Sequence, residues 1–72
     1  MTQVPPSHFS PELVALMKVA LDTAVGQIPR EHRTTATKAK MAERIVRTAS
    51  EGVTDLHELM SVGVDEGRVP AA

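Results

Sequence analysis

The side chains that could carry out chemistry are few and lie far apart in the sequence. The chain of 72 residues has no cysteine, and its three histidines fall in three different segments, at His8, His32 and His57. None of them has a second histidine three or four residues away. The densest polar group is Glu31-His32-Arg33, and a chain this short offers no deep pocket around it. We therefore predict no metal site, no cofactor and no enzymatic activity.

Basic residues gather in the middle of the chain and suggest a second kind of chemistry, phosphate binding. Residues 30–47 hold six basic and two acidic side chains, whereas residues 48–72 hold one basic and five acidic ones. On a helix, three of the basic residues share one face: Lys40, Arg44 and Arg47. This face would contact phosphates if the protein were a dimeric nucleic-acid-associated accessory protein. Alternatively, it is a solvated face, or it pairs with the acidic third segment within one chain or across a dimer.

Two features weigh against nucleic acid as the partner. The formal net charge is −1, and the chain has no tryptophan or tyrosine on which bases could stack. The second and third helices resemble a helix-turn-helix in outline, but no arginine or lysine lies between Thr48 and Gly67. A recognition helix with mainly acidic outer side chains would be repelled by phosphate.

The elements that position these residues are helices, so the predicted fold class is all-α. A first helix is expected over Pro11–Gln27, because Ser10 is a good N-cap, Pro11 suits the first helical position and Pro29 disfavours helical geometry at Ile28. A second begins near Thr35 to Thr37 and ends before Gly52 in the left-handed position. Thr54 caps a short third helix, which ends near Val62 or Val64. We expect a helical hairpin plus this third helix.

The same signals set the predicted domain boundaries. Residues 1–9 form an extended or disordered leader, residues 10–64 form a single helical domain, and residues 65–72 form a flexible tail. No run of about 18 apolar residues is present, so no membrane span is expected. The first residues lack the basic and apolar regions of a signal peptide, and we expect a cytoplasmic protein.

The first helix carries an apolar arc about 180° wide, more than one neighbouring helix covers. We therefore predict a homodimer that associates through this helix, as a non-enzymatic interaction or regulatory protein. An adaptor that folds on a larger protein partner is a further alternative. The expected interface residues are Leu13, Leu16, Met17, Val19, Ala20, Leu21, Val25 and Ile28. The remaining bundle is expected to be closed by Ile45, Val46, Leu56, Leu59 and Met60.

The segment from Glu31 to Asp55 resembles a segment of short uncharacterised bacterial all-helical proteins. There, an E-x-R-T…A-E-R-I-(L/V)…A…G…D pattern follows a helix and a P-x-E turn, which is Pro29-Arg30-Glu31 here. The resemblance implies a small helical bacterial protein and carries no activity or ligand with it. Residues 42–49 are also similar to part of the first helix of tetracycline-repressor-type regulators.

Overall fold

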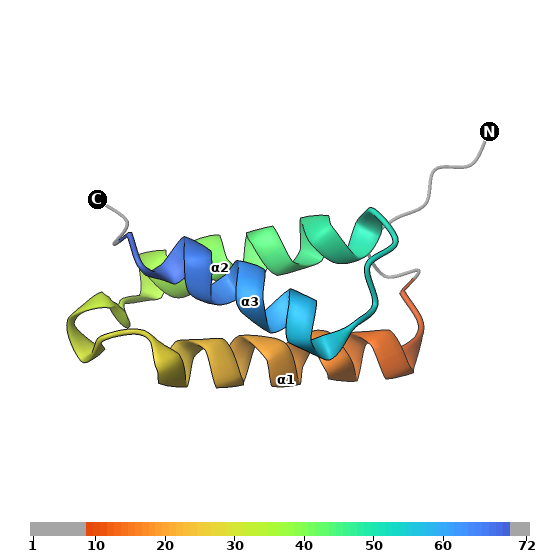
Figure 1. Cartoon of the computed structure of the whole chain (residues 1–72), viewed down its shortest axis with the longest axis horizontal. Helices are drawn as coiled ribbons and strands as arrows, with labels where there is room; N and C mark the ends of the chain where they lie inside the picture. The colour runs from red at the N-terminus through yellow and green to blue at the C-terminus, as the bar shows by residue number, and fades with distance from the viewer. Residues whose placement is uncertain (1–8, 70–72) are drawn as a thin grey trace.

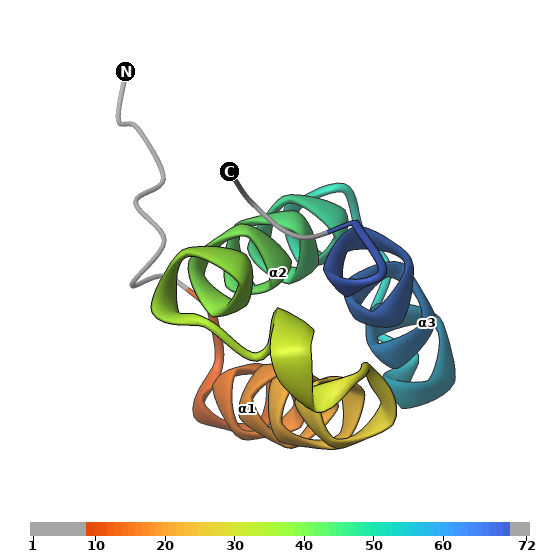
Figure 2. The same ribbon diagram turned by 90° about the vertical axis from the view of Figure 1, so that its left-hand side faces the viewer.

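The computed structural model describes residues 9–69 and places three α-helices in this range (Figure 1). They are α1 (Pro11–Gln27), α2 (Thr35–Ser50) and α3 (Leu56–Gly67), and a 3₁₀ turn, η2 (Arg30–His32), links the first two. The predicted all-α class is confirmed. Seen end-on, the three helices occupy the corners of a triangle, and α3 packs against both other helices (Figure 2). No helix in residues 9–69 is long and apolar enough to cross a membrane.

The first helix begins and ends where the sequence predicts. The Ser10 Oγ accepts a hydrogen bond from the Leu13 amide at 3.1 Å, which satisfies one of the free N–H groups of the first turn. The last carbonyls are satisfied by Arg33, whose guanidinium donates to the carbonyl oxygens of Gly26 and Ile28, both at 3.2 Å. Arg33 therefore folds the connecting segment back onto the end of α1.

The second helix begins at Thr35, within the predicted range of Thr35 to Thr37. Its cap is Thr34, whose side chain accepts from the Thr37 amide at 3.1 Å. At the other end, Gly52 has φ +101°, as predicted from its place after the last helical turn. The amides of Gly52 and Val53 donate to the carbonyls of Ala49 and Thr48, which is the Schellman pattern of a helix end.

The third helix differs most from its prediction. Asp55, and not Thr54, is the cap, and it accepts from the Glu58 amide at 2.9 Å. The helix continues past Val62 and Val64 to Gly67, so residues 65–67 belong to the helical domain and not to a tail. The leader residues 1–8 and the tail residues 70–72 lie outside the described residues.

Two glycines explain why α3 is longer than expected. A Cβ atom at position 67 would lie 2.8 Å from Met41 Sδ and 2.9 Å from Ile28 Cγ2. At position 63 it would lie 3.0 Å from Ile45 Cδ1 and 3.1 Å from Ala24 Cβ. Both glycines are buried, one helical turn apart, on the face that α3 turns to the other helices. They permit close packing of α3 against α1 and α2 instead of ending the helix.

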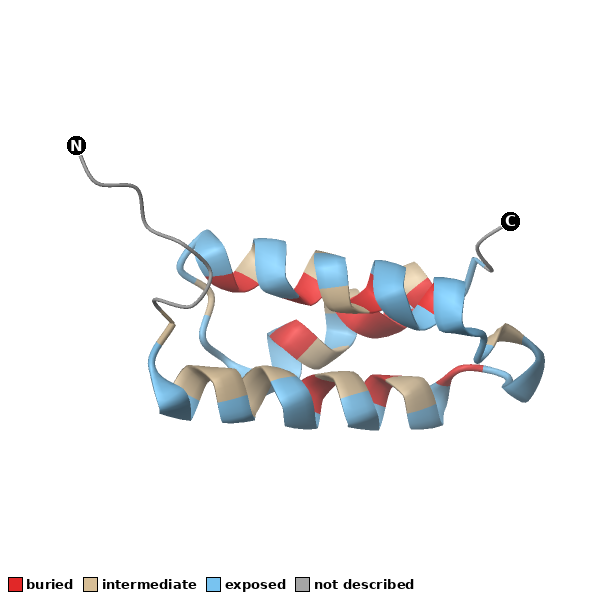
Figure 3. Ribbon diagram, turned by 180° about the vertical axis from the view of Figure 1, so that it is seen from behind, coloured by how far each residue is buried: buried red, intermediate tan, exposed pale blue. Residues whose placement is uncertain are grey.

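The core lies between the three helices and consists of small and medium side chains (Figure 3). One cluster contains Ala20, Ile45, Ala49 and Leu59, and the other contains Ala24, Ile28, Met41 and Val64. Two residues expected to close the bundle are exposed instead, Val46 by 36% and Leu56 by 39%. Val46 lies beside residues of α1 on the side of the bundle away from α3, so α3 does not cover the apolar surface there.

Candidate interaction surfaces

The side chains that could act in catalysis or metal binding either make a contact that connects two elements or are exposed to solvent. His32 Nδ1 donates to the Gly67 carbonyl at 3.1 Å, since a carbonyl oxygen only accepts, and this bond connects the loop after α1 to the end of α3. Glu31 and His57 are exposed, and His8 lies outside the described residues. Residues 9–69 contain no group of three or more histidine or acidic side chains arranged to hold a metal ion. The polar groups therefore contribute to helix ends and connections.

The residues predicted to form an interface on α1 fall into three groups. Ala20 and Ile28 are buried in the core, at 0% and 2% exposure, so we leave them out of any contact surface. Val19 is 50% exposed and lies about 140° around the helix from Val14. The remaining five are half-buried and border the core: Leu13, Leu16, Met17, Leu21 and Val25.

An apolar groove runs between α1 and α2 on the side of the bundle away from α3. Its volume is about 180 Å³, and no residue of α3 lines it. Figure 3 shows the molecule from this side, with α2 along the top and α1 along the bottom of the bundle. Apart from Lys18, the lining side chains are apolar: Val14, Met17, Leu21, Ala42, Ile45 and Val46. The two helices therefore present a mainly apolar face that no residue of α3 covers.

The groove combines residues from two helices, and sequence reasoning identified only part of it. Met17 and Leu21 belong to the predicted interface, whereas Val14 and the three α2 residues do not. The missed signal is the outer edge of the α2 apolar stripe, where Val46 lies about 100° from Ile45 around the helix. A helical wheel of α2 shows that its apolar stripe is wide, but it does not show which neighbouring helix covers each edge of the stripe.

A second, more polar hollow lies at the start of α1. Its volume is about 330 Å³, and its lining is Ser10, Glu12, Leu13, Leu16 and Thr54. Leu13 and Leu16 are the predicted interface residues found here. Hydroxyl and carboxylate groups form part of this lining. The hollow is therefore less suited to bind an apolar helix face than the groove between α1 and α2 is.

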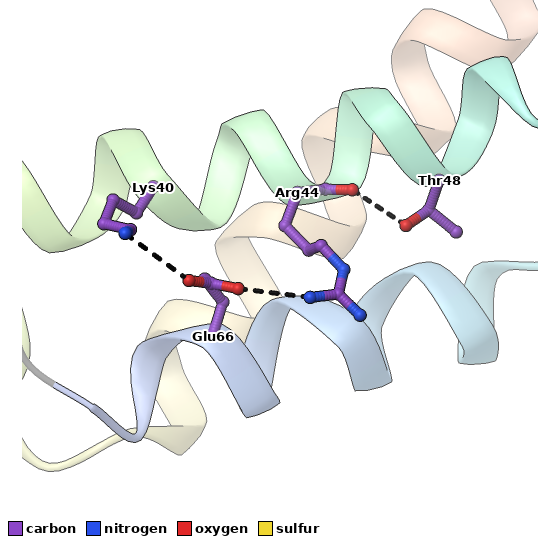
Figure 4. A network of polar contacts seen from close by, with 4 residues as sticks. All are labelled: Lys40, Arg44, Thr48 and Glu66. Atoms are coloured by element: carbon purple, nitrogen blue, oxygen red, sulfur yellow. Dashed lines mark hydrogen bonds and ion pairs between the residues drawn. The ribbon is translucent and has the colours of Figure 1, made fainter.

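The basic face of α2 is turned toward α3 and is partly neutralised there (Figure 4). Glu66, whose side chain is 26% exposed, lies 3.3 Å from Arg44 Nη1 and 3.8 Å from Lys40 Nζ. The alternative that the acidic third segment pairs with the basic second within one chain is thus confirmed. Arg47 has no ion pair with any described residue, including Glu43 and Glu51, which lie four residues before and after it on the chain. Phosphate contacts at these residues stay a prediction.

Comparisons with protein-family models, curated proteins and solved structures find no significant match to this chain. The resemblance to short bacterial helical proteins therefore stays a prediction. Function has to be inferred from the surfaces themselves, and among those described the groove between α1 and α2 is the most distinctive.

Proposed function

We propose that this protein is a non-enzymatic interaction protein that acts as a homodimer, in which a second copy covers the groove between α1 and α2. The observation that supports this proposal is the groove itself, whose lining is mainly apolar on both helices and is left uncovered by the other described residues. Helix pairs that expose such a surface are stabilised by packing against further helices. Two copies related by a two-fold axis would place their grooves face to face and form a four-helix contact layer.

The size of the surface suits a second copy. Helices of 17 and 16 residues are about 25 Å long, and two neighbours together are about 20 Å wide. The face therefore covers roughly 500 Å² per copy, or about 1,000 Å² in a dimer, which reaches the lower bound of a specific interface. We expect a reversible dimer with a micromolar dissociation constant, because interfaces of this size give modest affinity.

The first test compares two Val→Glu variants by sedimentation equilibrium. Val46→Glu puts a charge into the groove and is expected to raise the dimer Kd by about 100-fold or more, since a carboxylate is desolvated in a mainly apolar contact. Val19→Glu is the matched control, because Val19 is also exposed on a helix but does not line the groove. It is expected to leave the Kd unchanged, and far-UV circular dichroism checks that both variants keep their helices.

Two outcomes would contradict the proposal. One is a wild-type chain that stays a folded monomer of 7.7 kDa at about 100 μM. The other is a dimer that Val19→Glu weakens as much as Val46→Glu does. A chain that is unfolded alone in a circular-dichroism melt would instead favour an adaptor that folds on a larger partner.

A further inference from the structure

The edge of α1 that borders the groove carries two opposite charges one turn apart, Lys18 and Asp22. Lys18 lines the groove, and Asp22 is exposed four residues further along the same helix. Neither side chain takes part in an ion pair or side-chain hydrogen bond with any described residue. Elsewhere in residues 9–69, opposite charges do pair across helices, as Glu66 does with Arg44 and Lys40. The two charges beside the groove are therefore free to pair with another molecule.

The order of apolar and charged residues along this edge of α1 is nearly symmetric, apart from the sign of the two charges. Along it come Val14, Lys18, Asp22 and Val25, which lie within about 80° of one another around the helix. Reversal of the helix direction places valine opposite valine and a positive charge opposite a negative one. Self-complementarity of this kind is what a two-fold interface requires, because residue i of each copy contacts residue j of the other.

We propose that, in the dimer, the α1 helices of the two copies pack antiparallel across a two-fold axis that crosses the exposed edge of α1 midway between Lys18 and Asp22, level with Ala20. Lys18 of each copy then faces Asp22 of the other. This inference rests on the proposed function, since it concerns the arrangement of the same groove. A parallel arrangement would put Lys18 next to Lys18 and Asp22 next to Asp22, and like charges at close range oppose association.

The same axis suits the second helix. The groove lining pairs residues 14–21 of α1 with residues 42–46 of α2, so an axis level with Ala20 passes close to Ala42. Antiparallel packing about that point places Val46 of one copy opposite Ala39 of the second copy. A larger side chain facing a smaller one lets the two α2 helices approach each other without a clash.

Charge reversal gives a direct test by sedimentation equilibrium. Lys18→Glu leaves two acidic residues on the edge, and Asp22→Lys leaves two basic ones, so each variant alone repels its own copies. Each is expected to raise the dimer Kd by about tenfold, because two attractive contacts become repulsive. An equimolar mixture restores opposite charges at both contacts and is expected to form a heterodimer within about threefold of the wild-type Kd. Both charges lie on the helix surface, so the fold of each chain is retained.

Disulfide trapping fixes the direction of the helices, since the chain has no cysteine of its own. When Lys18→Cys and Asp22→Cys chains are mixed and oxidised, an antiparallel pair gives mainly the mixed disulfide, whereas a parallel pair gives mainly the two homodimeric ones. Predominant homodimeric disulfides, or charge variants that dimerise like wild type, would overturn the antiparallel arrangement. They would leave the proposed function intact if Val46→Glu still dissociates the dimer. A monomeric wild-type chain would instead refute the proposed function.

Discussion

Single atoms decide the packing of this small bundle, and the clearest case is the missing Cβ at Gly67. The neighbours of that position are Met41 and Ile28, which are 0% and 2% exposed, so neither side chain has free space to move into. A single side chain is also important at the end of α1, where the guanidinium of Arg33 donates hydrogen bonds to two backbone carbonyls. Because the core of this bundle is small, such individual contacts make up a large share of the stability.

At the residue scale, Gly67→Ala is expected to destabilise the protein by about 1–3 kcal/mol, because overpacking outweighs the better helix propensity of alanine. Gly26→Ala is the matched control. Gly26 is also helical, but nothing would contact its Cβ within 4 Å, and the change is expected to stabilise by up to about 1 kcal/mol. Urea unfolding at one fixed protein concentration measures both effects. Equal stabilisation by the two substitutions would show that α3 does not pack as closely as described.

At the scale of the elements, each helix begins at an oxygen-bearing side chain that accepts from the first turn. The caps are Ser10, Thr34 and Asp55. These three interactions fix where the helices start, and the loops between them are short. Of the three, Asp55 is the one that local sequence signals place incorrectly, because Thr54 beside it is also a good capping residue.

Substitution of the two neighbouring residues distinguishes them. Asp55→Ala is expected to lower the free energy of unfolding by about 1 kcal/mol, because the Glu58 amide loses its acceptor. Thr54→Ala is expected to change it by no more than about 0.5 kcal/mol, since Thr54 is exposed and caps nothing. Chemical denaturation monitored at 222 nm gives both values. A larger loss for Thr54→Ala than for Asp55→Ala would restore the sequence-based cap.

The sequence predicted the helices well where the signals are local. Ser10, Pro11 and Pro29 act within a few residues of where they stand, and the predicted bounds of α1 are those found. Gly63 and Gly67 carry the same local end signal, but contacts with α1 and α2, distant in sequence, override it. For the same reason the groove was predicted only in part. A helical wheel gives the apolar edge of each helix, whereas the triangle of three helices decides which edges stay open.

At the scale of the whole molecule, α3 covers one side of the α1–α2 pair and the groove remains on the other. If a second copy covers the groove, folding and association are coupled, because part of the apolar surface is buried only in the dimer. The basic and acidic segments do not oppose this arrangement. Glu66 already compensates Lys40 and Arg44 on the α2–α3 side, away from the groove.

Coupled association makes thermal stability depend on concentration. For a chain of this length that unfolds as it dissociates, each tenfold rise in protein concentration is expected to raise Tm by about 5 °C. Calorimetry or circular dichroism between about 5 and 500 μM covers two such steps. The Val46→Glu variant is the control, and its Tm is expected to depend less on concentration because its dimer dissociates more readily. A wild-type Tm that does not change over this range would mean that the chain completes its fold as a monomer.

The tight approach of α3 to its neighbours also affects how this sequence can change over time. The two buried glycines of α3 lie directly against its neighbours, Gly63 against Ala24 and Gly67 against Ile28 and Met41. Outer surfaces of the helices can accept many substitutions, but bulk added at either glycine forces the helices apart. Homologues of this chain that keep its architecture should therefore share a sequence pattern. We expect two glycines four residues apart in the last helix, facing a small residue in the first helix.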